Sequence, residues 1–213
     1  GMSLGRQPPR AASAAAEAHA ITWKAAGKGG AVAAGRSPAV KAGITLLEQA
    51  GNAADGAAAT LLALAVTDYG RFAIGGEIPF IIYDASSQKV KVLCGLGRAP
   101  LDQKAIDWFY ENGIPATGSM KAAPVPGAID LCITALRIFG TKSFAEAVAP
   151  ALELLDAGGP QWHADLAMTF RKLIETEHKE RGTRQEKLVA TRDRFYKGDL
   201  ADEMESWYIQ IGA

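Results

Sequence analysis

Few residues of this 213-residue chain combine a reactive side chain with a spacing that suits chemistry. The three histidines, His19, His163 and His178, form no His-x-x-x-His pair, which excludes a zincin-type metal site. The two cysteines, Cys94 and Cys132, are too few for a four-cysteine zinc site or a disulfide scaffold. Neither cysteine stands beside a basic residue, so we expect both to be buried, unreactive thiols. The pattern implies no metal and no organic cofactor.

Arg98 is the strongest candidate for contact with a small molecule, because a guanidinium can clamp a carboxylate with two parallel hydrogen bonds. The alternative is a surface arginine at the exit of a hairpin. Gly75 and Gly76 are the second candidates, as a loop whose backbone N–H groups face a substrate. The alternative for them is a plain turn that needs a positive φ. Glu77 is either a carboxylate of the site or a solvated side chain.

Composition excludes several other classes of protein. Hydrophobic residues make up 48% of the chain and charged residues 22%, which is typical of a globular protein with one or two domains. Lys and Arg total 23, as do Asp and Glu, and this zero net charge argues against nucleic-acid or membrane-surface binding. No apolar run approaches the ~18 residues that a membrane span needs.

The N-terminal residues differ from the rest. Gly1-Met2 resembles the scar that a protease leaves after removal of a tag. Residues 1–29 are rich in Ala, Pro, Gly and Ser, so we expect a peripheral arm with a helix over 11–20. The folded segment is expected over residues 30–213.

The elements that must position Arg98 and the glycines come early in the chain. The pattern predicts strands at 30–34, 79–84 and 90–95 as neighbours in one sheet, the last two as a hairpin, and helices at 38–50 and 53–69 packed on one face of it. Ser37 is expected to cap the first helix, whose apolar face would be Val40, Gly43, Ile44 and Leu47.

The remaining pattern is mostly helical. Helices are predicted at 103–112, from Gly127 to Phe139, from Ser143 to Asp156, at 163–180 and at 199–211. Ser143 with Glu146 forms a capping box, Asn52 suits an N-cap, and Asp55 suits a first helical turn. Residues 171–194 hold eight Lys/Arg and five Asp/Glu, a mixture that indicates a solvated face or a loop.

Taken in order, these segments resemble the N-terminal part of the large subunit of the γ-glutamyltranspeptidase family. The resemblance covers residues 30 to the end of the chain and rests on six motifs in register. These are the small-residue run at 32–34, GNAADGAAA at 51–59, AIGGEIPFIIYD at 73–84, VPG at 125–127, PALELLDAG at 150–158 and YKGDLA at 196–201.

The resemblance implies an α+β fold, helix-rich in this segment, that is part of an N-terminal-nucleophile hydrolase αββα sandwich. In that family a precursor cleaves itself, and a threonine at the start of the small subunit attacks γ-glutamyl amides such as glutathione. It therefore implies a partner, the small subunit from the same precursor, and a γ-glutamyl substrate. Family members are commonly exported, which favours an extracytoplasmic location.

Two departures from the family pattern bear on activity. The nucleophile pattern T-x-H-x-x-x-x-D is absent: Thr176-Glu177-His178 matches its start, but Thr183 stands at the aspartate position, so we interpret this match as chance. No catalytic residue is therefore expected in this chain, and the chain alone should be inactive. In addition, Leu96 occupies the position of the family's substrate-carboxylate arginine, two residues before Arg98.

Two hypotheses follow from the departure at Leu96. Either Arg98 replaces the family arginine through a shifted loop, or this site does not bind the α-carboxylate of glutamate. For the whole protein, the chain is then either part of a γ-glutamyltransferase or hydrolase, or a non-catalytic member of the family. A non-catalytic member would be a structural or small-molecule-binding module.

Overall fold

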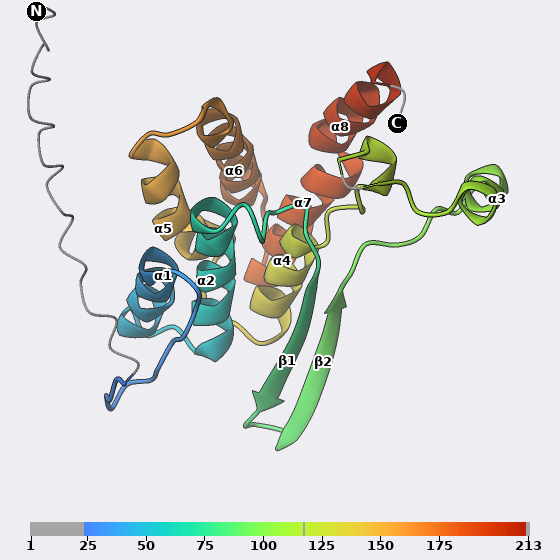
Figure 1. Cartoon of the computed structure of the whole chain (residues 1–213). Coiled ribbons are helices and arrows are strands. Elements are labelled where there is room, and N and C mark those ends of the chain that lie inside the picture. Colours follow the sequence, from blue (N-terminus) through green and yellow to red (C-terminus); the bar gives the residue numbers. More distant parts are fainter. Residues whose placement is uncertain (1–23, 117, 212–213) are drawn as a thin grey trace, which may run out of the picture.

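The computed structural model describes residues 24–116 and 118–211 (Figure 1). The helix expected at 11–20 lies outside these residues. The described chain contains α1 (Ser37–Glu48), α2 (Ala53–Thr67), β1 (Ile78–Asp84), β2 (Lys89–Gly95), α3 (Gln103–Asn112), the 3-10 turn η1 (Met120–Ala122), α4 (Ala128–Ile138), α5 (Phe144–Asp156), α6 (Gln161–Lys179), α7 (Arg184–Lys197) and α8 (Asp199–Gln210). Apart from the 30–34 strand, the predicted elements therefore form close to their expected bounds.

Six helices pack into a helical body, which we define as α1, α2 and α4 to α7 (Figure 1). The helix α2 lies at its centre, where it contacts α1, α4 and α5. Alanines dominate α2, and ten of its residues are buried, so the helix has neighbours on most sides as its all-round apolar pattern predicts. The main core lies between α2 and α4 to α7, and its largest fully buried side chains include Phe144, Phe170 and Leu136.

Glycines bring α1 and α2 into close contact. A Cβ on Gly43 would collide with the hydroxyl of Thr60 and would lie 3.0 Å from the carbonyl oxygen of Gly56. A Cβ on Gly56 would in turn lie 3.3 Å from the carbonyl oxygen of Gly43. The buried face of α1 is Ala39, Ala42, Gly43 and Leu46, which is rotated by one residue from the predicted face. Small residues, not the largest ones, set this face because the two backbones approach so closely.

The N-terminus of α1 is also shifted by one residue from its prediction. Arg36 is the N-cap, Ser37 is the first helical residue, and no side chain caps the helix. By contrast, the N-cap predicted at Asn52 and the capping box predicted at Ser143 both form, and Asn52 makes a capping box with Asp55 as well. Pro38 lies in the first turn of α1, where its missing N–H costs nothing, so a capping side chain is not needed to start the helix there.

Two buried carboxylates join helix ends that are distant in sequence. Asp55 is fully buried, and its oxygens accept hydrogen bonds from the backbone N–H groups of Asn52, Thr141 and Lys142 at 2.8 to 3.0 Å. Glu177 on α6 accepts bonds from the N–H groups of Phe144 and Ala145 at 2.8 Å each. Both carboxylates therefore satisfy backbone donors that helix starts leave free, which fixes α2 and α6 against α5.

The mixed-charge segment 171–194 spans the end of α6 and most of α7, so it is helical and not a loop. Part of it is a solvated face, as predicted, but Glu177 is only 3% exposed. Arg184 donates hydrogen bonds to the carbonyl oxygens of Leu136, Gly140 and Lys142 at 2.8 to 3.0 Å. Charged residues of this segment thus complete backbone hydrogen bonding at the end of α4.

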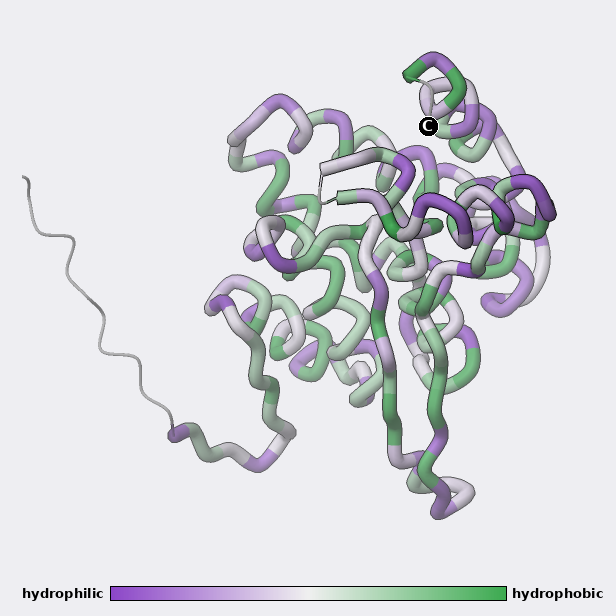
Figure 2. The backbone as a smooth tube through the Cα atoms, turned by 45° about the vertical axis from the view of Figure 1, so that its right-hand side comes forward, coloured by the Kyte–Doolittle hydropathy of each residue, from purple (hydrophilic) through white to green (hydrophobic). Residues whose placement is uncertain are grey.

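The strands β1 and β2 pair antiparallel, with Ile81 opposite Val92 and Tyr83 opposite Val90. One face of this hairpin packs through Ile78 and Phe80 on α4. The opposite face holds Pro79, Ile81, Tyr83, Val90, Val92 and Cys94, all of which are exposed. Long apolar stretches of both strands are visible in Figure 2. We call this six-residue surface the outer hairpin face.

Three expectations about the sheet are wrong. Residues 30–34 form no strand, and Val32 instead packs beside Gly43 of α1. An extended segment without a neighbouring strand leaves its backbone groups unpaired, so it does not become part of a sheet. The helix that packs on β2 is α4, with Ala57 and Leu61 of α2 at the edge of the same apolar cluster, while α1 packs on α2 and reaches α5. Cys94 is exposed because it lies on the outer hairpin face, whereas Cys132 is buried as expected.

Candidate functional site

The candidate substrate-binding residues lie where three glycine-containing segments meet. The N–H of Gly127 donates a hydrogen bond of 3.3 Å to the carbonyl oxygen of Gly76. A Cβ on Gly127 would collide with the carbonyl oxygen of Gly95, and one on Gly97 would lie 2.5 Å from that of Val125. Glycine at these positions lets the loop before β1, the exit of β2 and the VPG segment before α4 pack backbone to backbone.

Gly75 and Gly76 differ in their surroundings. The N–H of Gly76 donates to the carbonyl oxygen of Ala73 at 2.8 Å, and a Cβ there would lie 3.4 Å from the ring of Phe72. Around Gly75 no described atom lies within 4 Å of a Cβ position. Neither glycine has a positive φ, so the alternative of a turn that requires one is wrong. Glu77 is exposed, as expected for a solvated side chain.

Arg98 and Leu96 both lie in the extended segment that follows β2. The strand ends at Gly95, so these two residues do not share a strand face by alternation. Both are exposed, but only Arg98 lines the large groove described below. Among the described residues, Arg98 has neither a hydrogen-bonding nor an ion-pair partner, which leaves its guanidinium free for a ligand.

A groove of about 970 Å³ opens between the segment at Arg98, α3, η1 and α8. Its walls are mainly apolar and aromatic: Leu101, Trp108, Phe109, Met120, Tyr196, Met204, Tyr208 and Ile209. Three charged residues, Arg98, Lys121 and Glu205, complete the lining. Gly75 and Gly76 do not line the groove; their loop reaches the exit of β2 through the pairing of Ile78 with Gly95 and through the contact with Gly127.

Tyr196 fixes the VPG segment against α7. Its hydroxyl donates a hydrogen bond of 2.5 Å to the carbonyl oxygen of Pro126 and accepts one of 3.0 Å from the N–H of Asp130. Burial raises the pKa of this phenol. Because both partners are backbone groups, the Tyr196 hydroxyl is occupied structurally, and only its ring is presented to the groove.

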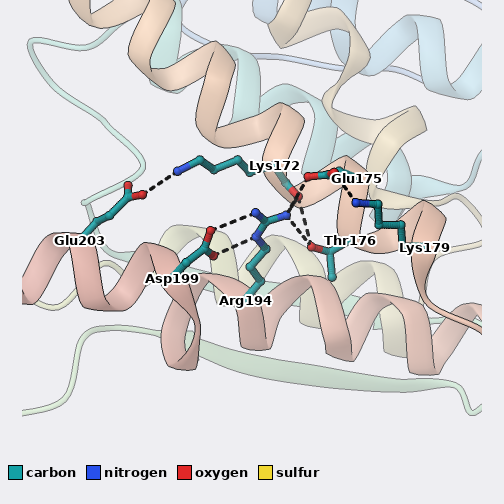
Figure 3. Close-up of polar contacts among 7 residues, drawn as sticks. All are labelled: Lys172, Glu175, Thr176, Lys179, Arg194, Asp199 and Glu203. Carbon is teal, nitrogen blue, oxygen red and sulfur yellow. Dashed lines mark hydrogen bonds and ion pairs between the residues drawn. The ribbon is translucent and has the colours of Figure 1, made fainter.

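The helix α8, one wall of the groove, is held by the polar network in Figure 3. The Arg194 guanidinium binds both carboxylate oxygens of Asp199 at 2.9 and 3.0 Å, and Lys172 binds Glu203 at 2.7 Å. The bidentate bond to Asp199 raises the pKa of Arg194. These bonds link the start of α8 to α6 and α7, so they set the direction in which α8 leaves the helical body.

The Thr176-Glu177-His178 match to a nucleophile motif has a structural explanation. In Figure 3 the hydroxyl of Thr176 lies beside Arg194, from which it accepts a hydrogen bond of 3.1 Å. It also donates to the carbonyl oxygen of Lys172 within α6, and its neighbour Glu177 caps α5. Both side chains are occupied within the helical body, so the interpretation of this match as chance is consistent with the structure.

No helix in the described ranges is long and apolar enough to cross a membrane. The same residues contain no group of three or more His, Cys, Asp or Glu side chains arranged to hold a metal ion.

A sequence model of gamma-glutamyltranspeptidase matches residues 39–206 of the chain. This chain belongs to the γ-glutamyltranspeptidase family. It is 30% identical over 171 residues to the glutathione hydrolase-like YwrD proenzyme of Bacillus subtilis. This alignment covers 78% of the chain and 32% of the relative. It is 31% identical over 118 residues to rat glutathione hydrolase 5 proenzyme, over 54% of the chain and 20% of the relative.

Solved structures of this family have the same fold. The γ-glutamyltranspeptidase of Pseudomonas nitroreducens, solved in complex with L-DON, aligns with a TM-score of 0.63 at 26% identity, over 88% of this chain and 62% of that one. Cephalosporin acylase from Bacillus halodurans aligns with a TM-score of 0.62 at 21% identity, over 82% of this chain and 38% of that one. At this identity the likeness supports the fold alone. The α+β fold is thus that of an N-terminal-nucleophile hydrolase, and this chain spans only about a third or less of the curated relatives.

Proposed function

We propose that residues 30–213 are the large-subunit portion of a γ-glutamyltransferase or hydrolase that acts on γ-glutamyl amides such as glutathione, with its threonine nucleophile outside this chain. The observation that carries the proposal is the family match over residues 39–206. Names of the relatives support the chemistry, because the B. subtilis and rat proteins are glutathione hydrolase proenzymes.

The outer hairpin face supports a partner for this segment. Ile81 is 73% exposed and Val92 is 68% exposed, although both are large apolar residues in a paired strand. A contiguous apolar patch of this kind marks an interaction surface. We assign this face to contact with the small subunit of the same precursor, in agreement with the proenzyme status of the relatives.

Arg98 is the residue proposed to hold the substrate's α-carboxylate. It would take the role of the family arginine, whose position is occupied here by Leu96. Its guanidinium is exposed, lines the groove and has no partner among the described residues. Of the two glycines, Gly75 is proposed to offer a backbone N–H to the substrate, because the space around it is open. Gly76 is proposed to shape the loop, because its N–H and carbonyl are bonded to Ala73 and Gly127.

Expression of the gene's complete reading frame tests the proposal. The expected product is two bands after self-cleavage, the smaller beginning with threonine, and hydrolysis of glutathione. The printed 213-residue chain, assayed in parallel with a γ-glutamyl anilide, should release no product. A single uncleaved band without turnover would contradict the proposal and support a non-catalytic member of the family.

Replacement of Arg98 by alanine in the cleaved enzyme tests the carboxylate contact. A hydrogen bond to a charged group contributes about 1.5–3 kcal/mol, so catalytic efficiency should fall at least ~10-fold. Arg71→Ala is the matched control, because Arg71 is an exposed arginine outside the groove. Equal efficiency of the two variants would remove Arg98 from the site.

A further inference from the structure

The groove beside Arg98 has the size and the lining of a small-molecule site. Its volume of about 970 Å³ lies within the range of roughly 300–1,000 Å³ that is usual for ligand pockets. Aromatic and aliphatic side chains form most of its surface, with a few charged groups between them. Such a lining favours a ligand with a large apolar part and a small charged part.

The three charged residues of the groove indicate where the charged part of such a ligand would lie and whether it is an anion or a cation. The ammonium of Lys121 lies 4.8 Å from the ring centroid of Trp108, so it is already engaged with an aromatic face. Glu205 lines the groove from α8 and disfavours an anion on that wall. Arg98 is the cation of the lining that has no partner among the described residues. An anionic group is therefore most favourable at the Arg98 end.

We propose that this groove binds elongated apolar carboxylates, with the carboxylate on Arg98 and the apolar body between Trp108 of α3 and Tyr208 of α8. A carboxylate matches the planar fork of a guanidinium, and the two aromatic side chains, one from α3 and one from α8, offer apolar surface to the body of the ligand. The inference rests on the proposed function where it names a substrate class: γ-glutamyl amides whose amine part is aromatic or apolar, in preference to the polar cysteinylglycine of glutathione.

The requirement for a carboxylate on the ligand is tested by calorimetric titration of the purified 213-residue chain. The two ligands are 2-naphthylacetate and its neutral analogue 2-naphthylacetamide. We expect the acid to bind at least ~5-fold more tightly than the amide, and Arg98→Ala to abolish this preference. Arg71→Ala, the exposed arginine outside the groove, should keep it. Equal binding of acid and amide, or a preference that survives Arg98→Ala, would overturn the proposal.

The apolar body is tested with two tryptophan variants. Trp108 lines the groove, whereas Trp207 lies on α8 outside the lining. We expect Trp108→Ala to weaken 2-naphthylacetate binding by ~5-fold or more and Trp207→Ala to leave it within about twofold. A larger loss with Trp207→Ala would place the naphthyl ring elsewhere. Circular dichroism spectra of the variants should match that of the unmodified chain, which controls for loss of helical structure.

A third titration separates this inference from the proposed function. If γ-glutamyl-2-naphthylamide binds in an Arg98-dependent way and glutathione binds at least ~5-fold more weakly, the substrate class is supported. Equal binding of the two γ-glutamyl compounds would overturn the preference for apolar amines while leaving the proposed function intact. Arg98-dependent binding of 2-naphthylacetate without any binding of γ-glutamyl-2-naphthylamide would retain the groove as a carboxylate site and reject the proposed substrate contact.

Discussion

The helical body buries its large apolar side chains, whereas the hairpin and α3 leave many of theirs exposed. In the body, Phe144, Phe170 and Leu136 have no exposed surface. In the hairpin and α3, large apolar residues such as Ile81 and Tyr110 are mostly exposed, and α3 has no buried residue at all. Figure 1 shows α3 lying beyond the end of the hairpin, away from the body. The body therefore completes its own apolar core, whereas the hairpin and α3 leave large apolar side chains exposed.

Polar groups follow the same division. In the body, Asp55, Glu177 and Arg184 are satisfied by backbone groups of other elements. Near the groove, Arg98 and Glu205 have no partners among the described residues. Buried charges must be paired because desolvation is costly, whereas exposed charges remain available for ligands. Stability should therefore depend on the body, and binding on the hairpin side.

The two cysteines give the largest expected contrast between these regions. Cys94 is exposed on the hairpin, while Cys132 is buried in α4, where desolvation raises the pKa of its thiol to about 12. With Ellman's reagent at pH 8, we expect one thiol to react rapidly and the second ~1,000-fold more slowly, through unfolding. Cys94→Ser should remove the fast phase. Two fast thiols would mean that the body opens readily.

Asp55→Ala should produce a large loss of stability. It removes the acceptor for the N–H groups of Asn52, Thr141 and Lys142 and leaves these donors without a partner. We expect the free energy of unfolding to fall by about 3–5 kcal/mol in urea denaturation. Asp102→Ala is the control: this exposed N-cap of α3 binds one N–H group and should cost about 1 kcal/mol. Similar losses for both variants would contradict the proposed role of Asp55.

Substitutions on the two faces of the hairpin should differ in the size of their effect on stability. Ile81→Thr and Val92→Thr, made together, keep β-branched side chains at an exposed cross-strand pair. Each substitution should change the free energy of unfolding by less than about 0.5 kcal/mol. Binding of a hydrophobic dye should decrease. Phe80→Ala, on the face that packs against α4, should cost about 3 kcal/mol. A loss of similar size from the outer pair would show that this face is already covered.

The smallest expected effect concerns the turn between β1 and β2. Hydrogen bonds from Ser87 and Ser86 lower the pKa of Asp84 from 3.8 to about 2. Because the folded pKa is depressed, this carboxylate stabilises the turn above pH ~4, and the contribution is lost as pH falls toward 2. An NMR titration should show a midpoint near pH 2 for Asp84, and Ser87→Ala should move it upward. A wild-type midpoint at the ordinary value would show that the turn lacks these bonds.

Much of the secondary structure could be predicted because its signals are local. The N-cap at Asn52, the capping box at Ser143 and the hairpin at 79–95 depend on residues a few positions apart. The family, too, was recognisable from motifs in register. One wrong prediction concerns pairing: residues 30–34 look like a strand, but a strand requires a neighbour that local sequence does not supply.

For the candidate site, the sequence identified Arg98 and two glycines but gave no sign of the groove. Its walls come from α3, η1 and α8, which lie up to about a hundred positions apart in the chain. Likewise the mixed charges of 171–194 resembled a solvated surface, although Glu177 and Arg184 bond to distant helix ends.

Local sequence therefore predicted most of the helices, the hairpin and the family, because capping, periodicity and motif order are read from neighbouring residues. Only the tertiary structure decided that α4 covers the hairpin, that Cys94 is exposed, and that Arg98 meets an aromatic groove. These outcomes depend on how closely Gly43, Gly56 and Gly127 let backbones approach, and on which distant groups pair with buried charges. Such contacts form between segments far apart in the chain, and no local pattern encodes them.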